Sequence, residues 1–215
     1  MLEQKLIADR FLNLPQAMLT RPGLVPPHRP GDFVLYPPQL YHIQDSTGVF
    51  TKTSAVVPGA GAPHRTFNWL VYTAGLITQV AMLGTDVLTG PMSGCFLIVF
   101  RKANGVPHVA HVGTHDTDAV QTAAVQQAWN AFAQGHLGDI VGGFNPLRAW
   151  NGPLPARKAG DGAPYMFGLC TSNNQFYAVF TFQQANPATS VRIAGLQHIA
   201  SATPQRLQHI DRPGP

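Results

Sequence analysis

The chain has 215 residues, which suits one domain with a substantial core, and its hydrophobic fraction of 45 % is typical of folded proteins. Charged residues make up only 11 % of the chain, against roughly 25 % in an average soluble protein, so neutral polar residues must cover much of the surface. The net charge is +4, but lysines and arginines never form a run longer than two, which argues against a nucleic-acid partner.

The sequence predicts neither a classical signal peptide nor a membrane-spanning segment. The first residues lack the basic start and apolar run of a signal peptide, and the apolar stretches at 69–82 and 96–100 are interrupted or too short to span a bilayer. Two cysteines, Cys95 and Cys170, are too few for a disulfide framework, so both are expected to be free thiols. We therefore expect no contact with a membrane. A protein exported by a dedicated secretion machine would also lack a classical signal peptide, so export by that route stays open.

The N-terminal part is expected to contain one helix followed by a proline-rich arm. Residues 3–19 predict a short helix from the spacing of Leu6, Ile7, Phe11, Leu12 and Met18. Prolines are dense between residues 22 and 38, which indicates an ordered loop or extended arm. Short strands are expected at 33–36 and 48–57, and a turn or loop at 58–63.

Residues 67–82 mix aromatic, β-branched and small side chains, and their periodicity does not separate helix from strand. A short apolar piece at 85–89 then runs into a break at Gly90-Pro91. The most definite prediction follows: strands at 95–101 and 106–112 form a hairpin around Lys102-Ala103-Asn104-Gly105.

One helix and three strands are expected in the second half. The helix begins near residues 114–118, which offer N-cap candidates, and ends at Gly135. Its apolar face carries Val125, Ala128, Trp129 and Phe132. A Gly/Pro-rich loop is expected at 138–164. Strands are expected at 165–171, 176–183 and 190–199.

These elements predict a single α+β (α/β) domain over residues 1–215. A mixed, mostly antiparallel β-sheet or sandwich is flanked by helices. The proline-rich arm spans about residues 22–38, and a frayed tail is expected at about 204–215.

The hairpin brings a thiol and an imidazole together. If Ala103-Asn104-Gly105 forms a three-residue loop with Gly105 in the left-handed conformation, Cys95 lies opposite Gly113. His111, two positions away, then projects from the same face of the sheet as Cys95. A two-residue turn would put His111 on the opposite face. His108 projects away from His111 because their separation is odd, which argues against a metal site built from these histidines, so no metal or cofactor is expected.

Cys95 stands where a loop becomes a strand, at a sheet end that a substrate is expected to reach. Ser93 and Gly94 precede it and can leave amide N–H groups pointing at a bound carbonyl. A cysteine next to a histidine is the typical pair for nucleophilic attack on an amide, because the imidazole accepts the thiol proton. Thr89 is the candidate for orienting His111, with Asp86 or a backbone carbonyl as alternatives. Cys170 is expected to pack in the core.

The segment Met92-Ser93-Gly94-Cys95 resembles the Leu-Ser-Gly-Cys signature of the deamidase toxins typified by the cytotoxic necrotizing factor catalytic domain and the Burkholderia lethal factor, with Met92 in place of the leucine. In that family the cysteine opens a strand and a histidine follows, as His111 follows Cys95 here. The spacing of Thr89, Cys95 and His111 is also similar to that of the bacterial chemoreceptor glutamine deamidase, whose triad is Thr, Cys and His.

The resemblance implies a protein-glutamine deamidase with Cys95 as nucleophile, His111 as base and Thr89 as orienting group. Its substrate would be a glutamine of a folded host protein. The protein would be a bacterial toxin or effector, secreted without a classical signal peptide and acting in the host cytoplasm; the bacterial cytoplasm is the alternative location. Three other functions remain open on the sequence: a cysteine protease, a transglutaminase with the same dyad, and a non-catalytic protein-binding module.

Overall fold

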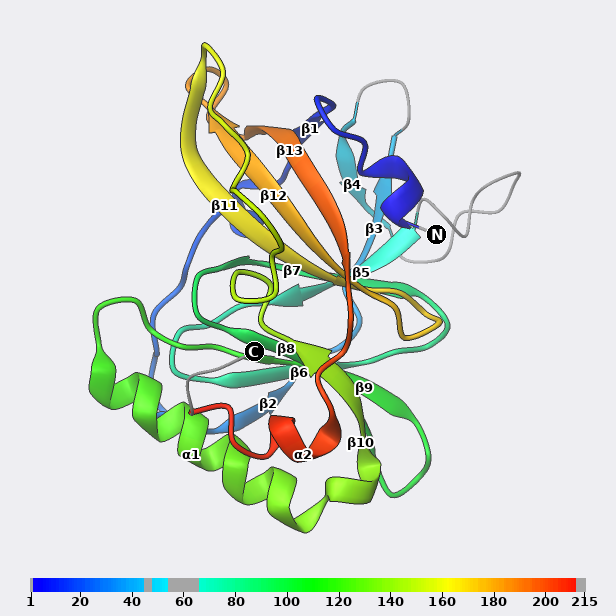
Figure 1. Ribbon diagram of the computed structural model, residues 1–215, viewed down its shortest axis with the longest axis vertical. Coiled ribbons are helices and arrows are strands. Elements are labelled where there is room, and N and C mark those ends of the chain that lie inside the picture. Colours follow the sequence, from blue (N-terminus) through cyan, green and yellow to red (C-terminus); the bar gives the residue numbers. More distant parts are fainter. Residues whose placement is uncertain (1, 45–47, 54–65, 212–215) are drawn as a thin grey trace.

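Two β-sheets packed face to face make up most of the computed structural model, which describes residues 2–44, 48–53 and 66–211 (Figure 1). In the described residues the larger sheet has the strand order β1 (Phe11–Asn13), β13 (Ser190–Ile199), β12 (Phe176–Gln184), β11 (Asp161–Cys170), β7 (Asp86–Met92), β5 (Thr66–Val71), β3 (Leu40–Ile43) and β4 (Phe50–Lys52). The smaller sheet has the order β10 (Ile140–Phe144), β8 (Phe96–Arg101), β9 (Pro107–Val112), β6 (Ile77–Ala81) and β2 (Phe33–Leu35).

Most neighbouring strands run antiparallel. Only the β2/β6 and β5/β7 pairs are parallel among the described strands. The α+β class with a mostly antiparallel sandwich is therefore confirmed.

The outer face of the smaller sheet is covered by α1 (Ala119–Gly135) and α2 (Pro204–Leu207) (Figure 1). The predicted helix is confirmed: the Asp118 side chain caps its N-terminus by accepting a hydrogen bond from the Gln121 amide, and the helix ends at Gly135. Val125 and Trp129 are fully buried on its apolar face. The alanine-rich composition of α1 favours a helix, and the packing of its apolar face against the sheet fixes the helix in place.

Alternation along β8 divides its side chains between two clusters. Leu97 and Val99 point into the core between the two sheets, whereas Ile98 and Phe100 point outward, toward the helices. On β9, His108 lies on the outer face, with its ring centroid 5.8 Å from that of Phe100. Period-two alternation therefore places His111 on the inner face, between the sheets.

The helix predicted over residues 3–19 is wrong. The segment instead forms the 3-10 turns η1 (Leu2–Lys5) and η2 (Gln16–Met18) on either side of the short strand β1. Asp9 has a φ of +66°, which no right-handed helix accommodates, and Pro15 interrupts the chain again. The apolar residues cover the outer face of the larger sheet from an irregular strap rather than from one helical stripe. Those that pack in this cluster are Leu2, Leu6, Leu12, Leu14, Met18 and Leu19.

Several other boundaries differ from the sequence prediction. The undecided segment 67–82 forms two strands, β5 and β6, and β7 continues through the expected break at Gly90-Pro91. Strand β10 lies inside the expected loop 138–164, and β3 was not predicted. The expected turn at 58–63 lies outside the described residues, as do residues 54–57 of the expected strand.

The C-terminal tail is ordered where it is described, so the expectation that it frays is wrong for residues 204–211. Leu207 and Ile210 are fully buried against α1, and the Trp129 indole N–H donates to the Leu207 carbonyl at 2.8 Å. The η4 turn (Leu137–Asp139) connects α1 to β10. No helix in the described part of the chain is long and apolar enough to cross a membrane.

Between the N-terminal strap and β2, the proline-rich arm crosses one end of the smaller sheet. The Pro22 carbonyl accepts a hydrogen bond from the Ala74 amide at 3.1 Å, and the Gly31 amide donates to the Gly75 carbonyl at 2.7 Å. This end of the sheet is also where β8 begins and β9 ends. The arm thus lies close to the residues predicted to be functional.

Candidate active site

The register of the β8/β9 hairpin is the one predicted for a three-residue loop. The Lys102 amide donates to the Val106 carbonyl at 3.1 Å, and Gly105 has a φ of +76°. Leu97 then pairs with His111, which puts Cys95 opposite Gly113 at the open end of the hairpin. Cys95 and His111 are diagonal neighbours on the inner face of the smaller sheet.

Thr89, on β7 of the larger sheet, holds His111 across the interface between the sheets. Its hydroxyl oxygen lies 2.6 Å from His111 Nδ1 and 2.8 Å from the Leu70 carbonyl oxygen. A hydroxyl has one proton, and the carbonyl can only accept, so Thr89 donates to Leu70 and must accept from His111. Nδ1 therefore carries the imidazole proton and Nε2 carries the free lone pair. Among the described residues, His111 Nε2 has no hydrogen-bond partner although it is buried.

Of the alternatives for orienting His111, Asp86 is wrong. Its two carboxylate oxygens accept hydrogen bonds from the backbone amides of Leu2 at 2.6 Å and Ser172 at 2.9 Å, so Asp86 ties the N-terminal strap to the larger sheet. The backbone carbonyl of Leu70 takes part indirectly, because it fixes the hydroxyl of Thr89.

Cys95 is less accessible than its position at a strand end suggests. Its side chain is 1 % exposed, and Sγ lies 3.5 Å from the Thr114 hydroxyl and 3.9 Å from the Thr114 carbonyl oxygen. The thiol therefore has Thr114 rather than His111 as its hydrogen-bond partner. The expectation that a substrate reaches Cys95 directly is wrong for this state, because Thr114 covers the thiol.

Burial keeps both the Cys95 thiol and the His111 imidazole neutral in this state. It raises the pKa of the Cys95 thiol, against the opposing effect of hydrogen bonds from Thr114 and from the backbone of Ser93 and Gly94. Burial also lowers the pKa of His111 to about 3. At neutral pH the protein thus holds a thiol and a neutral imidazole rather than a thiolate–imidazolium pair.

The backbone of Ser93 and Gly94 lies beside the Cys95 thiol. Their backbone amides favour negative charge on Cys95 Sγ. Asn145 fixes this turn, because its side-chain amide donates to the Gly94 carbonyl at 3.0 Å. The Gly94 carbonyl shares its peptide plane with the Cys95 amide, so this hydrogen bond fixes the peptide that leads into Cys95.

Tyr72, Thr114 and Asn145 complete the site and were not found from the sequence. The Tyr72 ring lies 4.9 Å from the His111 ring, centroid to centroid, and its hydroxyl donates to the Thr114 carbonyl at 2.8 Å. Tyr72 thus contacts both His111 and Thr114, the residue that lies against the Cys95 thiol. No local pattern marks it, since Tyr72 falls in the stretch whose periodicity was ambiguous.

A surface cavity of about 300 Å³ lies beside the residues that flank Cys95, and Ser93, Gly94 and Thr114 are among those that line it. At its rim the Ser93 hydroxyl donates to Asp116, and Asp116 also forms an ion pair with Arg21 of the N-terminal segment. Arg148 borders the cavity on another side. Thr114 thus borders this cavity and also contacts Cys95 Sγ.

The other candidate residues lie elsewhere. Cys170 is fully buried at the end of β11, and burial raises the pKa of its thiol. His108 points away from the site, as predicted. Within the residues described by the structure, no group of three or more histidine, cysteine or acidic side chains is placed to hold a metal ion.

Comparisons of the chain with protein-family models, with curated proteins and with solved structures give no match.

Proposed function

We propose that this protein is a cysteine-dependent glutamine deamidase, in which Cys95 is the nucleophile, His111 the general base and Thr89 the orienting residue. The observation that carries the proposal is the hydrogen bond from His111 Nδ1 to Thr89, which leaves the Nε2 lone pair without a partner on the sheet face shared with Cys95. Most buried polar atoms in proteins are hydrogen-bonded, so a buried lone pair without a partner on the face shared with a thiol supports a role in accepting a proton.

The reaction proceeds in two halves. Cys95 Sγ attacks the side-chain carbonyl carbon of glutamine while His111 Nε2 takes the thiol proton, and the carbonyl electron pair moves onto oxygen. The carbon–nitrogen bond then breaks, the imidazolium gives its proton to the departing nitrogen, and ammonia leaves a thioester on Cys95. Water, deprotonated by His111, attacks the thioester and releases glutamate and the thiol.

The Ser93–Gly94 turn supplies the donors for the negative charge that develops in each half. Its amide groups already favour negative charge at the Cys95 sulfur, and removal of one such donor typically costs about 10²–10³ in rate. Burial holds His111 neutral and, with a pKa of about 3, also disfavours its imidazolium, so transfer of the thiol proton requires a more polar environment around His111 than this state provides. Neither half of the reaction calls for a metal or cofactor.

Catalysis requires Thr114 to move. In this state the Thr114 side chain and carbonyl contact Cys95 Sγ, and the cavity above them is open to solvent. We assign to the glutamine side chain the role of displacing Thr114 as it enters, so that its amide replaces Thr114 as the hydrogen-bond partner of the thiol.

Glutamine of a host protein is proposed as the substrate because the Ser-Gly-Cys turn and its Thr/His partners resemble those of deamidase toxins. The toxin or effector role, and action in the host cytoplasm after export, rest on the same resemblance. A transglutaminase would form the same thioester and pass it to an amine, and a protease would cut a backbone amide. A second candidate is a non-catalytic binding module, which is favoured by the burial of Cys95 at 1 % exposure.

The proposal is tested by incubating the protein with a eukaryotic cell lysate and mapping glutamine-to-glutamate conversion by mass spectrometry. Wild type and Cys170→Ser are expected to convert the same glutamines, because Cys170 packs away from the site, whereas Cys95→Ser converts none. Cleaved backbone amides would indicate a protease. If Cys95→Ser matches wild type, or if no protein in the lysate is changed while one is retained by the protein, the binding module replaces the deamidase.

A further inference from the structure

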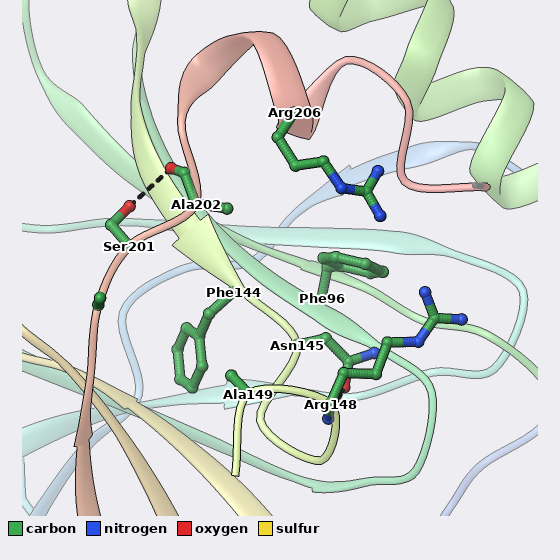
Figure 2. Close-up of a pocket in the computed structure, with 9 residues that line it drawn as sticks. Phe96, Phe144, Asn145, Arg148, Ala149, Ser201, Ala202 and Arg206 are labelled. Atoms are coloured by element: carbon green, nitrogen blue, oxygen red, sulfur yellow. Dashed lines mark hydrogen bonds between the residues drawn. The ribbon is translucent and has the colours of Figure 1, made fainter. Parts of the chain in front are cut away.

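Two pockets flank the outer face of β8, one at each end of the strand. The pocket at its start has a volume of about 230 Å³ and lies between Phe96 and the segment that leads into α2 (Figure 2). Both of its arginines are already engaged, because Arg148 lies 5.9 Å from the centre of the Phe96 ring and Arg206 donates to the His209 carbonyl. The larger pocket, at the end of β8, presents groups that have no such partners within the described part of the chain.

This larger pocket has a volume of about 660 Å³, which falls within the roughly 300–1,000 Å³ of small-molecule sites. It is lined by residues from the loop of the β8/β9 hairpin, from the C-terminal end of α1, from η4 and from strands β2 and β6. The hairpin loop is the end of the hairpin opposite to Cys95, and Phe100 lines the pocket from the outer face of the sheet. The pocket is therefore separate from the candidate active site.

Gln79 of β6 is the residue that points to a ligand. It lines the pocket and is only 6 % exposed, and its Oε1 is buried with no hydrogen-bond partner among the described residues. Most buried polar atoms in proteins are paired, and an unpaired one is unfavourable. A bound molecule that carries an N–H donor would satisfy this oxygen.

Aromatic rings line the same pocket. The Phe33 and Phe132 rings lie 5.0 Å apart, centroid to centroid, and the His136 ring stacks on Phe132 at 4.2 Å. Phe33 is 37 % exposed, so part of its ring is open to a ligand. Such rings bind planar heterocycles by stacking.

The charges of the pocket are divided between its two sides. Arg101 ends β8 and Lys102 follows it in the hairpin loop, and neither side chain forms an ion pair or a hydrogen bond with the residues that the structure describes. On the other side, Asp139 lies near the C-terminal end of α1, where the last carbonyls carry partial negative charge. The pocket therefore favours an anion beside the hairpin loop and hydroxyl or amino donors beside the helix.

We infer that this pocket binds a free adenine nucleotide. The amino group of adenine donates to Gln79 Oε1, and the adjacent ring nitrogen accepts from Gln79 Nε2, which is the paired contact by which a glutamine amide recognises adenine. Guanine presents two acceptors on that edge and would leave Oε1 unpaired. The purine stacks on the ring of Phe33.

The rest of the nucleotide matches the charged groups. The 5′-phosphate pairs with Arg101 and Lys102, and Asp139 accepts hydrogen bonds from the ribose hydroxyls. A free nucleotide suits this chain better than a nucleic-acid strand, because its lysines and arginines never form a run longer than two.

The inference is tested by calorimetric titration of the full-length wild-type protein with AMP. The matched probe is the 5′-phosphate of purine riboside, which differs from AMP only by the missing amino group. AMP is expected to bind about tenfold or more tightly than this analogue, because the analogue leaves Gln79 Oε1 unpaired. Adenosine, which lacks the phosphate, is expected to bind about tenfold more weakly than AMP, and AMP binding is expected to weaken as salt is added.

Four variants locate the binding. Gln79→Leu is expected to abolish the preference for AMP over the analogue without lowering the free energy of unfolding in urea, because the buried Oε1 has no partner to lose. Arg101→Gln is expected to weaken AMP about tenfold, whereas Lys52→Gln, which removes a charge from the edge strand β4 of the larger sheet, is expected to change nothing. Cys95→Ser is expected to bind AMP as wild type does, so this inference and the deamidase proposal can fail separately.

The inference is overturned if AMP and the purine analogue bind equally, if Gln79→Leu keeps the preference or unfolds more easily, or if Lys52→Gln weakens AMP as much as Arg101→Gln does. GMP or CMP binding more tightly than AMP would exclude the adenine contact. A short oligoadenylate that binds more than about tenfold more tightly than AMP would replace the free nucleotide with a single-stranded nucleic acid. Loss of AMP binding in Cys95→Ser would place the nucleotide at the candidate active site instead.

Discussion

Replacing Thr89 with valine removes one hydroxyl from a fully buried site with almost no change in shape. That hydroxyl donates to the Leu70 carbonyl at 2.8 Å and accepts from His111 Nδ1 at 2.6 Å. The substitution leaves two buried polar groups without partners, and each costs about 1–3 kcal/mol. We expect the free energy of unfolding to fall by about 2–6 kcal/mol, measured by urea denaturation, whereas Thr89→Ser, which keeps the hydroxyl and loses a methyl group, costs only about 1 kcal/mol.

The same variant reports on the tautomer of His111. In wild type, nitrogen NMR of the imidazole is expected to show the proton on Nδ1 and a free lone pair on Nε2. In Thr89→Val the preference for Nδ1–H is lost because its acceptor is gone, and glutamine conversion is expected to fall by about 10²-fold or more, as it does when a base loses the group that sets its tautomer. An Nε2–H tautomer in wild type would refute the reasoning, since His111 could then not accept the thiol proton.

Three further results are expected. The free energy of unfolding should fall as pH drops from about 6.5 toward 4, by about 1.4 kcal/mol per pH unit from His111 alone. The reason is that the unfolded histidine binds a proton that the folded one, with a pKa of about 3, does not bind. The His111→Gln variant should lose this slope, and an unchanged slope would contradict the burial of His111. The Thr114→Ala variant should be labelled at Cys95 by iodoacetamide about fivefold faster than wild type, because about 1 kcal/mol of hydrogen bonding to the thiol is lost. As controls, Cys95 in Thr117→Ala and Cys170 in all variants should be labelled at wild-type rates. Equal rates at Cys95 in Thr114→Ala and wild type would mean that Thr114 does not protect the thiol. Added salt should speed the labelling of Cys95 in wild type, because it screens the Arg21–Asp116 ion pair at the cavity rim. Cys95 in the Asp116→Asn variant should be labelled fast at all salt concentrations. A salt effect that persists in Asp116→Asn would exclude this ion pair as its source.

The hairpin and the shared face of Cys95 and His111 were predictable because they depend on local chemistry. Gly105 favours the left-handed conformation that closes a three-residue loop, and alternation with period two then determines which side chains share a face. The helix at 119–135 was predictable for a similar reason, since its capping residue, apolar face and terminal glycine are all within one segment.

The remainder of the site depends on packing between the sheets. Thr89 and His111 belong to different sheets, so only the sandwich itself selects Thr89 over Asp86, and the contacts of Tyr72 with Thr114 and of Asn145 with Gly94 join distant segments. The N-terminal strap was misread because its apolar residues cover a sheet rather than form a helical stripe. The burial of Cys95 depends on the irregular chain after β9, where no periodicity indicates the path of Thr114.

The central claim is that a glutamine side chain is hydrolysed through a thioester on Cys95. The most direct test is to run the reaction in water labelled with a heavy oxygen isotope. Lysate treated with wild-type protein in this water is expected to contain glutamate residues that have gained one heavy oxygen at the former amide carbon, and Cys95→Ser is expected to give none. Glutamines joined to amines instead of water would place the protein with the transglutaminases. Heavy oxygen incorporated equally by Cys95→Ser would contradict the account, because the hydrolysis would not pass through Cys95.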